Sequence, residues 1–412
     1  MYFRAKTAVW ITFLCAAPVA LHAQFDFTVD GRQVQVHSFA SQGFAYSNDN
    51  NYLTMNTSQG SFAMTDGGVN VSMQVSDKFR VGAQVYDMNL GQLGRWHPSL
   101  DWAVADYKFK DWLGIRGGKV KTVLGLHSDT QDLAFLHTFA LLPQAVYPID
   151  LRSSTIAHEG GDIYGEFPLM AHLGSMAYTA YAGQRQDSLY GGYPYFVENF
   201  GITLKSYGGL AVGQDLRWTT PLKGLLVGAS HQDEWLTGTG TNDWSVILGG
   251  PPNVVPYWEK TKKDQTDQFY GQYTVGNLTL ESEYRRYYRD ARIFSGAFEQ
   301  SADVRGWYVA ATYRVSKRFA FGSYYSHFVN NWIVTFPDTV EAPNQSDPSR
   351  HEYDKVVTAR LDVTRYWNVK VEGHFIDGWG GDQYPAGFYP RDNPGGFAPK
   401  TNMILVRTGW NF

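Results

Sequence analysis

The last residues of the chain form the pattern that most constrains its fold. Counting back by twos from Phe412 gives Trp410, Thr408, Val406 and Ile404, so aromatic and aliphatic side chains share one face of a strand. In water, such a bare apolar strand would be an edge that aggregates. In a membrane, this face meets lipid, and pairing with the first strand leaves no open edge. The pattern therefore predicts the closing strand of a transmembrane β-barrel.

This ending resembles the closing strand of bacterial outer-membrane β-barrels, which ends in Phe and carries another aromatic residue two positions earlier. The resemblance implies that Trp410 and Phe412 form the assembly signal recognised by the barrel-assembly machinery of a Gram-negative cell. It also implies that the protein is surrounded by outer-membrane lipid.

The first 23 residues have the pattern of a secretory signal peptide. Arg4 and Lys6 precede an apolar run at 8–21, and we expect cleavage after Ala23. A membrane-spanning helix is the alternative, but the run is short and a proline interrupts it. Cleavage would also remove Cys15, the only cysteine, so the mature chain would have no disulfide.

The remaining residues, 24–412, are expected to form a single barrel domain. No later segment approaches the roughly 18 apolar residues of a membrane helix, and no linker or change in composition divides the chain. Aromatic residues make up 16% of the sequence and charged residues 18%, which suits strands with one face in lipid. Loss of the two basic residues of the signal peptide changes the formal net charge from −4 to −6. This mild negative charge argues against a nucleic-acid partner.

Short turns alternate with long polar loops along the chain. The predicted short turns lie at 76–78, 110–112, 167–171, 221–223, 276–277, 316–318 and 366–368. The predicted long loops lie at about 47–59, 87–98, 122–154, 184–199, 236–262, 290–303, 331–350 and 379–398. Seven turns and eight loops connect sixteen antiparallel strands, with both termini on the periplasmic side. Because strand boundaries are soft, fourteen and eighteen strands remain alternatives.

Apolar and polar side chains alternate within the predicted strands. Val69 and Val71, for example, alternate with Asn70 and Ser72, which places one set against lipid and the other in the lumen. A soluble β-propeller or a large β-sandwich is the alternative. The sequence has no repeat of the length a propeller needs, and the signal peptide, the terminal Phe and the alternation of turns and loops favour the membrane barrel. Tryptophans near strand ends are expected in the girdles at the membrane interfaces. Four tyrosines with lumen parity leave a sugar-lined pore open as an alternative: Tyr86, Tyr270, Tyr308 and Tyr324.

The third long loop, 122–154, is apolar for an exposed segment, above all at 133–142. Such a stretch would not lie bare in water, and sixteen strands leave a bore that it can fill. We therefore expect this loop to fold inward. The runs 116–121 and 142–148 also resemble porins of the phosphate and dicarboxylate type. In general porins, which the chain resembles too, the third loop forms the constriction of the pore.

The basic residues before this loop have conflicting strand parity. If Arg116 points into the lumen, strict alternation turns Lys119 and Lys121 toward lipid, where a charge is costly. A β-bulge at Gly117-Gly118 would bring all three inward, and we adopt that interpretation. The alternative places the lysines at the rim or in a subunit interface.

An inward loop predicts a charged constriction that involves Arg116, Lys119 and Lys121. Charges of both signs across a narrow gap would create a transverse field. Basic residues outnumber acidic ones at positions with lumen parity, which favours anions. Pairing within the wall, for example of Glu281 with Arg285 or of Asp362 with Arg360, would weaken this preference. The further residues predicted at the constriction and in the lumen are Asp129, Asp132, Arg152, Glu159, Arg285, Arg314, Arg360 and Arg407.

The sequence predicts no catalytic, cofactor-binding or metal site. His158, Glu159 and Asp162 match no metal-binding spacing, and the sequence has no GxSxG motif. A barrel-embedded hydrolase of lipid or protein and a structural or adhesive barrel remain the alternatives.

The sequence as a whole predicts an all-β transmembrane barrel of about sixteen strands with an inward third loop. Its predicted function is that of an outer-membrane porin through which small hydrophilic solutes and ions diffuse passively. The resemblance to general porins implies a homotrimer. The strand near 174–182, rich in Gly, Ala, Ser and Thr, suits close packing of subunits but would also fit against lipid.

Overall fold

Antiparallel strands build almost the whole fold of the computed structural model, which describes residues 25–29, 31–170, 172–335, 347–380 and 387–412. The predicted signal peptide lies outside these residues. The first nine strands are β1 (Phe25–Val29), β2 (Arg32–Ser47), β3 (Ser61–Ser76), β4 (Phe79–Leu90), β5 (Ser99–Lys110), β6 (Leu113–Lys121), β7 (Ala157–Pro168), β8 (Ser175–Gln186) and β9 (Ile202–Thr219). The others are β10 (Leu225–Asp243), β11 (Val254–Val275), β12 (Leu278–Ile293), β13 (Phe298–Arg314), β14 (Phe319–Thr335), β15 (His351–Thr364), β16 (Trp367–Asp377) and β17 (Lys400–Asn411).

The described residues contain two short α-helices, α1 (Gly192–Val197) and α2 (Ser245–Leu248). Both lie in long loops between strands. No helix among the described residues is both long enough and apolar enough to cross a membrane.

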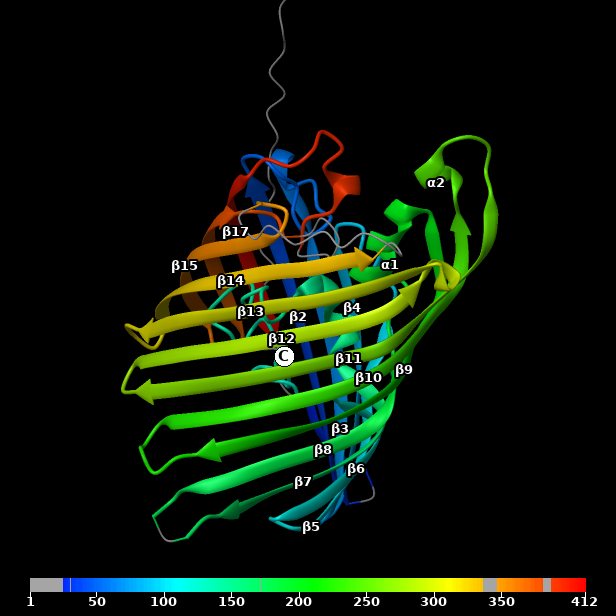
Figure 1. Cartoon of the computed structure of the whole chain (residues 1–412). Coiled ribbons are helices and arrows are strands. Elements are labelled where there is room, and N and C mark those ends of the chain that lie inside the picture. Colours follow the sequence, from blue (N-terminus) through cyan, green and yellow to red (C-terminus); the bar gives the residue numbers. More distant parts are fainter. Residues whose placement is uncertain (1–24, 30, 171, 336–346, 381–386) are drawn as a thin grey trace, which may run out of the picture.

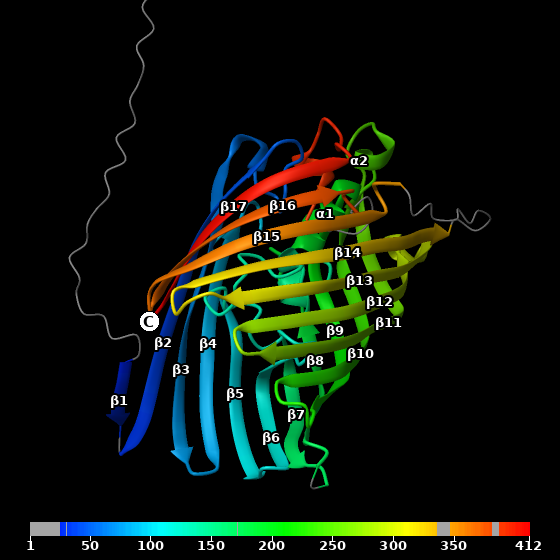
Figure 2. The same ribbon diagram turned by 90° about the vertical axis from the view of Figure 1, so that its left-hand side faces the viewer.

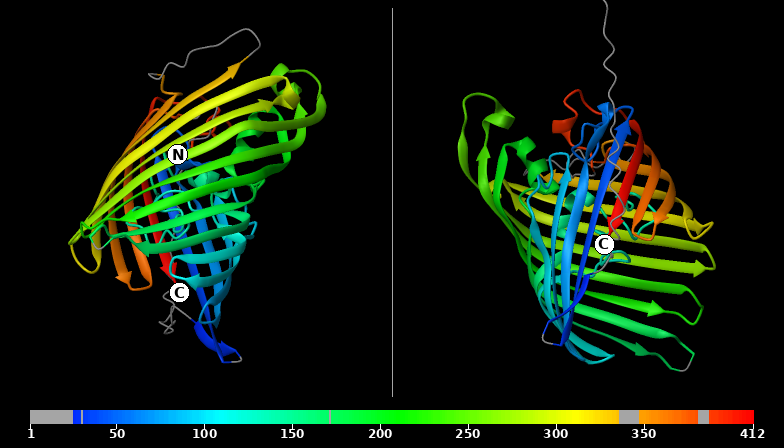
Figure 3. Two further views of the ribbon diagram at one scale, coloured as in Figure 1. Left: turned by 60° about the horizontal axis from the view of Figure 1, so that its bottom comes forward. Right: turned by 180° about the vertical axis from the view of Figure 1, so that it is seen from behind.

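The strands β2 to β17 form a closed barrel (Figure 1). Each pairs antiparallel with the next, and β17 returns to pair with β2. These are the sixteen strands that the turn pattern predicts, so the fold-class prediction is confirmed. Further views show the tilted strands with their short turns at one end and the long loops at the other (Figure 3).

One additional strand, β1, was not predicted. It pairs with the start of β2, from Phe25 opposite Val36 to Val29 opposite Arg32. Figure 2 shows it beside the lower end of β2, beyond the end of β17. The strand continues the line of β17 along β2, so it covers an edge that would otherwise be open. Its apolar residues Phe25, Phe27 and Val29 alternate with Asp26 and Thr28, but the strand is only five residues long.

All seven predicted short turns connect the strands expected, from the β3–β4 turn to the β15–β16 turn. Two predicted loops, 236–262 and 290–303, are wrong in extent. Strand β10 continues to Asp243 and β11 starts at Val254, while only 294–297 separate β12 from β13. The polar and Gly-rich residues there favoured a loop, but the extended ladder between β10 and β11 pairs them as strand.

The alternation of side chains between two faces is confirmed. Val69 and Val71 point outward and are 48% and 42% exposed. Trp112 and Trp367 are exposed beside short turns, as expected of an interface girdle. Trp235 is also exposed, but it lies in the middle of β10 rather than near a strand end. The four tyrosines with lumen parity are all buried, at 1–5% exposure. Because the chain itself covers them, they do not offer open faces to a sugar.

Candidate functional site in the lumen

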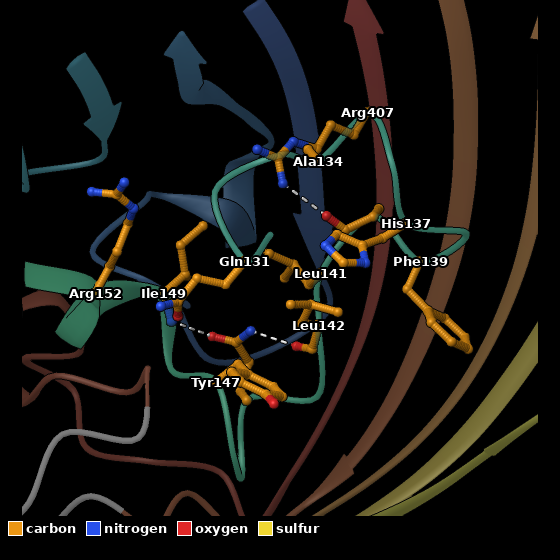
Figure 4. Close-up of a pocket in the computed structure, with 12 residues that line it drawn as sticks. Gln131, Ala134, His137, Phe139, Leu141, Leu142, Tyr147, Ile149, Arg152 and Arg407 are labelled. Atoms are coloured by element: carbon orange, nitrogen blue, oxygen red, sulfur yellow. Dashed lines mark hydrogen bonds between the residues drawn. The ribbon is translucent and has the colours of Figure 1, made fainter. Parts of the chain in front are cut away.

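The third loop runs from Thr122 to Ile156 and crosses the inside of the barrel. Its backbone N–H groups donate to side chains of strands far apart in the wall. The N–H of Gly125 donates to Ser230 Oγ of β10 at 3.0 Å. The N–H groups of Ala140 and Leu141 donate to the Glu372 carboxylate of β16, at 2.8 and 3.1 Å. The loop therefore spans the lumen as a partition, and Figure 4 shows it against the strands of the wall.

Basic side chains of the wall hold the carbonyl groups of this loop. Lys370 Nζ donates to the carbonyl of Phe139 at 2.8 Å. Arg360 donates to the carbonyl of His137, also at 2.8 Å. Arg407 donates to the carbonyl of Ala140 at 2.8 Å (Figure 4), and to the Asp66 carboxylate at 2.6 Å. Arg360 and Arg407 thus face the lumen as predicted, but they anchor the loop and are 5–6% exposed.

The apolar residues of the loop pack on the inner wall. Phe139, Leu142 and Val146 form a buried cluster with Tyr308 and Tyr324. Phe139 meets the Tyr324 ring edge-on, at 5.0 Å between centroids. These contacts give a physical reason why the run 133–142 is apolar although it belongs to no strand.

A second apolar core fills the lumen toward the long-loop end. Its members each expose 8% or less of their surface. They come from the first, second, third, fourth and eighth long loops and from the inner wall above the partition. Loop residues in this core are Tyr52, Leu53, Met55, Leu93, Ala140, Leu141, Tyr195, Phe196, Val197, Phe388 and Tyr389. The core therefore narrows the lumen at the long-loop end.

Asp132 is the centre of a buried charge network in the loop. Lys121 Nζ lies 3.1 Å from Asp132 Oδ1, and Arg152 Nη2 lies 3.4 Å from Asp132 Oδ2. Arg152 also pairs with Asp101 at 2.7 Å, and its guanidinium lies 3.8 Å from the centre of the Tyr86 ring. Burial alone would raise the pKa of Asp132, but the charges of Arg152 and Lys121 lower it. The carboxylate therefore stays ionised, and the network fixes the loop to β5 and β6.

The predicted bulge at Gly117-Gly118 is absent. The ladders of β6 with β5 and with β7 run through both glycines without a change of register. Gly118 has a φ of 123°, and a Cβ there would meet the Ala103 carbonyl oxygen at 2.2 Å, so close backbone approach requires glycine. Lys119 pairs with Ala103 and with Glu159.

Lys119 and Glu159 therefore do not join the constriction. Glu159 is exposed and lies opposite Gln184 in the next ladder. Gln184 alternates with the buried, lumenal Arg185, so this row faces outward. Lys121, at the very end of β6, still reaches Asp132 in the loop.

The lumen on the short-turn side of the loop contains a cavity of about 610 Å³. Arg116, Asp129, Tyr164 and Arg217 are among its lining residues. Asp129 is exposed there rather than facing Arg152 as predicted. Arg116 Nη2 lies 2.8 Å from Asp162 Oδ2.

Four ion pairs on the inner wall of the barrel share one property, namely that the cation is more exposed than the anion. The side chains of Arg116 and Asp162 are 24% and 0% exposed, and those of Arg217 and Asp215 are 25% and 5% exposed. The other two pairs are Arg80 with Asp106, at 54% and 13%, and Arg314 with Asp362, at 47% and 18%. In each of these four pairs, lumenal water therefore meets the guanidinium group more than its partner carboxylate.

A second cavity of about 470 Å³ also lies on the short-turn side, between the loop and β11–β14. His127 Nε2 lies 3.1 Å from Glu281 Oε2 in this region. Burial would lower the pKa of His127, but the hydrogen bond and charge of Glu281 raise it overall. Burial and the charge of His127 lower the pKa of the adjacent His137 to about 3. Of this pair, His127 is therefore the one that takes up a proton at the higher pH.

The two pairings considered within the wall have different outcomes. Arg360 pairs with Asp362 at 2.8 Å, as considered. Glu281 pairs with His127 instead of Arg285, whose Nη1 donates to the carbonyl of Val146 at 3.0 Å. Thus Arg285 also holds the loop. Lys370 and Glu372 have lumen parity in the sequence, but no sequence signal shows that they anchor this loop.

His158 lies inside the barrel, stacked on Tyr181 at 4.8 Å between ring centroids. Its Nδ1 lies 3.0 Å from Thr122 Oγ1, and its Nε2 has no hydrogen-bond partner among the described residues. The strand alternation turns Glu159 to the opposite face of β7. In the described part of the chain, no three His, Cys, Asp or Glu side chains are arranged to hold a metal ion.

No protein-family model matches the chain, and no curated protein matches it in sequence. Solved structures of outer-membrane proteins do match its fold. Outer-membrane expressed OmpT of Vibrio cholerae matches with a TM-score of 0.56 at 13% identity, over 94% of this chain and 100% of that one. OmpF of Salmonella typhi, in complex with daunomycin, gives 0.56 at 12% identity, over 94% and 100%. An anion-selective porin of Comamonas acidovorans gives 0.50 at 10% identity, over 92% and 100%. The chain therefore has the closed, sixteen-stranded barrel fold of outer-membrane porins.

Proposed function

We propose that the protein is a porin-type channel of the outer membrane, that small hydrophilic solutes cross it by passive diffusion, and that it prefers anions. Its barrel has the size that encloses an aqueous lumen in porins. Two cavities flank the third loop on the short-turn side, and charged side chains line both of them.

The observation that carries the anion preference is the unequal exposure within the four lumenal ion pairs. A solute in the lumen approaches the guanidinium groups more closely than the carboxylates. Coulomb energy falls with distance, so the nearer cation dominates even where the pair is neutral as a whole. One of the structural neighbours, the porin of Comamonas acidovorans, is anion-selective, which supports this assignment.

In this proposal, the third loop and the apolar core set the conductance. The loop divides the lumen, and the core narrows it on the extracellular side. The proposed channel therefore has a low conductance for its strand number, and solutes pass only through the space that these segments leave. The proposal gives no catalytic role to any residue and requires no cofactor.

Current through the purified protein in a planar lipid bilayer tests this function. We expect stepwise increases in current as single channels with a small, steady conductance insert. In a KCl gradient, we expect the reversal potential to shift toward the equilibrium potential of chloride. A protein that inserts as folded barrel without any conductance would contradict the proposal. Lipid or peptide hydrolysis by such a non-conducting barrel would support the enzyme alternative instead.

A further inference from the structure

A row of basic residues crosses the inner wall from β13 to β17. In the ladders, Ala320 of β14 separates Arg314 from Arg360. Lys370 follows opposite Arg360, and Arg407 follows opposite Lys370. Arg360, Lys370 and Arg407 are only 1–6% exposed, whereas the side chain of Arg314 is 47% exposed. This basic row is therefore buried along most of its length and open to lumenal water at Arg314.

The three buried members of the basic row each donate to a backbone carbonyl of the third loop. Within the described part of the chain, Arg314 instead donates to the Asp362 carboxylate at 3.3 Å and to the carbonyl of Lys317 at 3.5 Å. Both distances are long for a hydrogen bond to a guanidinium group. The row thus binds oxygen atoms of the loop along its length, and at its open end Arg314 offers donors to oxygen atoms of a solute.

Arg314 lines the cavity of about 470 Å³ between the third loop and β11–β14. The carboxylate in the same lining, that of Glu281, already has partners for both of its oxygens. Its Oε2 lies 3.1 Å from His127 Nε2, and its Oε1 accepts a hydrogen bond from Gln272 Nε2 at 2.7 Å. Asp362, the ionic partner of Arg314, is only 18% exposed. A solute in this cavity therefore meets an accessible positive charge at Arg314.

The third loop gives the same cavity an apolar side, formed by Leu136, Phe139 and Leu142. Phe139 and Leu142 are 5% and 9% exposed, because they pack on the wall. Leu136 is 54% exposed. A large aliphatic side chain that remains in contact with lumenal water forgoes the free energy of burial. A solute with an apolar surface would supply that burial for Leu136.

Threonines form the wall of the cavity between its basic and apolar sides. Thr274, Thr279 and Thr312 oppose one another across β11, β12 and β13, and all three line the cavity. The hydroxyl oxygens of Thr274 and Thr279 lie 3.1 Å apart and bond to each other. These side chains are short, uncharged and partly apolar. They can therefore face a flat apolar group without leaving a charge buried and unpaired.

The ladder also gives the scale of the cavity. Arg360 donates to the carbonyl of His137, the residue that follows Leu136. Arg360 and Arg314 lie two strands apart, which is about 10 Å at the usual spacing of strands. The guanidinium group of Arg314 and the apolar segment of the loop are thus separated by roughly the length of one small ring with a substituent, counting its contacts at both ends.

We propose that this cavity binds a small aromatic carboxylate. Its carboxylate accepts hydrogen bonds from Arg314, as planar carboxylates do from guanidinium groups, and its ring lies against Leu136 and Leu142. An inorganic anion would leave Leu136 in water, and an uncharged aromatic molecule would leave Arg314 without a new partner. The inference rests on the proposed function, because it names a class of solute for the porin-type channel.

Equilibrium dialysis of radiolabelled benzoate against the folded full-length barrel in lipid nanodiscs tests the site without any current measurement. We expect saturable binding to a single class of sites. Acetate has only the carboxylate and benzyl alcohol only the ring, so each should displace benzoate at least about tenfold more weakly than unlabelled benzoate does. Binding that does not saturate, or equal displacement by acetate and benzoate, would overturn the proposal.

Two variants, each with a matched control, test the two sides of the cavity. Leu136→Asn should raise the Kd for benzoate about fivefold, whereas Leu248→Asn, at a position of α2 that is 74% exposed, should leave it unchanged. Arg314→Gln should raise the Kd about tenfold or more, whereas Arg305→Gln, at an outward position, should not. All four positions are exposed, so the variants are expected to fold. An unchanged Kd for Leu136→Asn or for Arg314→Gln would overturn the proposal.

The same preparation separates this inference from the proposed function. A barrel that conducts ions in a planar bilayer but binds no benzoate would overturn the inference alone. A barrel that binds benzoate with the expected dependence on Leu136 and Arg314 but carries no current would support the site and contradict the proposed channel.

Discussion

Phe412 and Ser38 exchange both of their backbone hydrogen bonds. The N–H of Phe412 donates to the Ser38 carbonyl at 2.6 Å, and the N–H of Ser38 donates to the Phe412 carbonyl at 2.8 Å. The pair extends the β17–β2 ladder, which begins at Asn411 opposite Phe39. The last residue of the sequence thus completes the seam that closes the barrel.

Deletion of Phe412 should therefore reduce assembly of the barrel. The change removes the final pair of the closing ladder and the aromatic residue of the predicted assembly signal. We expect less heat-modifiable barrel in the outer membrane and more unfolded protein in the periplasm, measured by fractionation and immunoblotting. A normal amount of folded barrel would show that this residue is dispensable for assembly.

Deletion of 133–142 should raise the conductance, by about twofold or more, since a sixteen-stranded barrel without its inward loop has an open bore. Single-channel recording measures this change. A matched control is deletion of 245–250, an exposed loop segment that includes α2, which should leave the conductance near that of the unaltered chain. Equal conductance of the two deletion variants would mean that the third loop does not restrict the pore.

Leu141 and Leu136 provide a sharper comparison within the same loop. Leu141 is 2% exposed and Leu136 is 54% exposed. Leu141→Ser should lower the free energy of unfolding by about 2–4 kcal/mol, and Leu136→Ser by less than about 0.5 kcal/mol. Urea unfolding of the barrel in lipid vesicles measures both. Similar losses for the two variants would contradict the packing described for the loop.

The His127–Glu281 pair should make stability depend on pH. The pKa of His127 is raised in the folded protein, so its stabilisation is fully present below the usual value near 6.5 and is lost as pH rises through the folded value. Near pH 6, the free energy of unfolding of the unaltered chain should exceed that of His127→Gln by about 1–3 kcal/mol. This difference should shrink in alkaline buffer. Urea unfolding over a range of pH measures it. A difference that grows with pH would contradict this sign.

The barrel could be predicted from the sequence because its determinants are local. Alternation places Val69 and Val71 on one face regardless of what surrounds them, and short turns such as 276–277 mark strand ends directly. The apolar run 133–142 likewise predicted a loop that must be buried against the rest of the protein. These features depend on the chemistry of neighbouring residues, which a sequence displays.

The details of the lumen could not be predicted, because they depend on residues far apart in the chain. Parity put Glu372 in the lumen, but its hydrogen bonds with Ala140 and Leu141 depend on how the loop crosses the barrel. The bulge was wrong for a related reason. It assumed that Lys119 must avoid the outward face, whereas the ladder keeps it there, opposite Glu159.

The preference for anions is the central claim, and a reversal potential tests it most directly. The variant Arg116→Gln/Arg217→Gln removes two of the exposed lumenal cations, whereas Arg305→Gln removes an outward-facing arginine that is 49% exposed. In a KCl gradient across a planar bilayer, the double variant should shift the reversal potential toward the equilibrium potential of potassium. Arg305→Gln should give the same reversal potential as the unaltered chain. If the double variant keeps the original reversal potential, the lumenal arginines do not select the solute and the account is wrong.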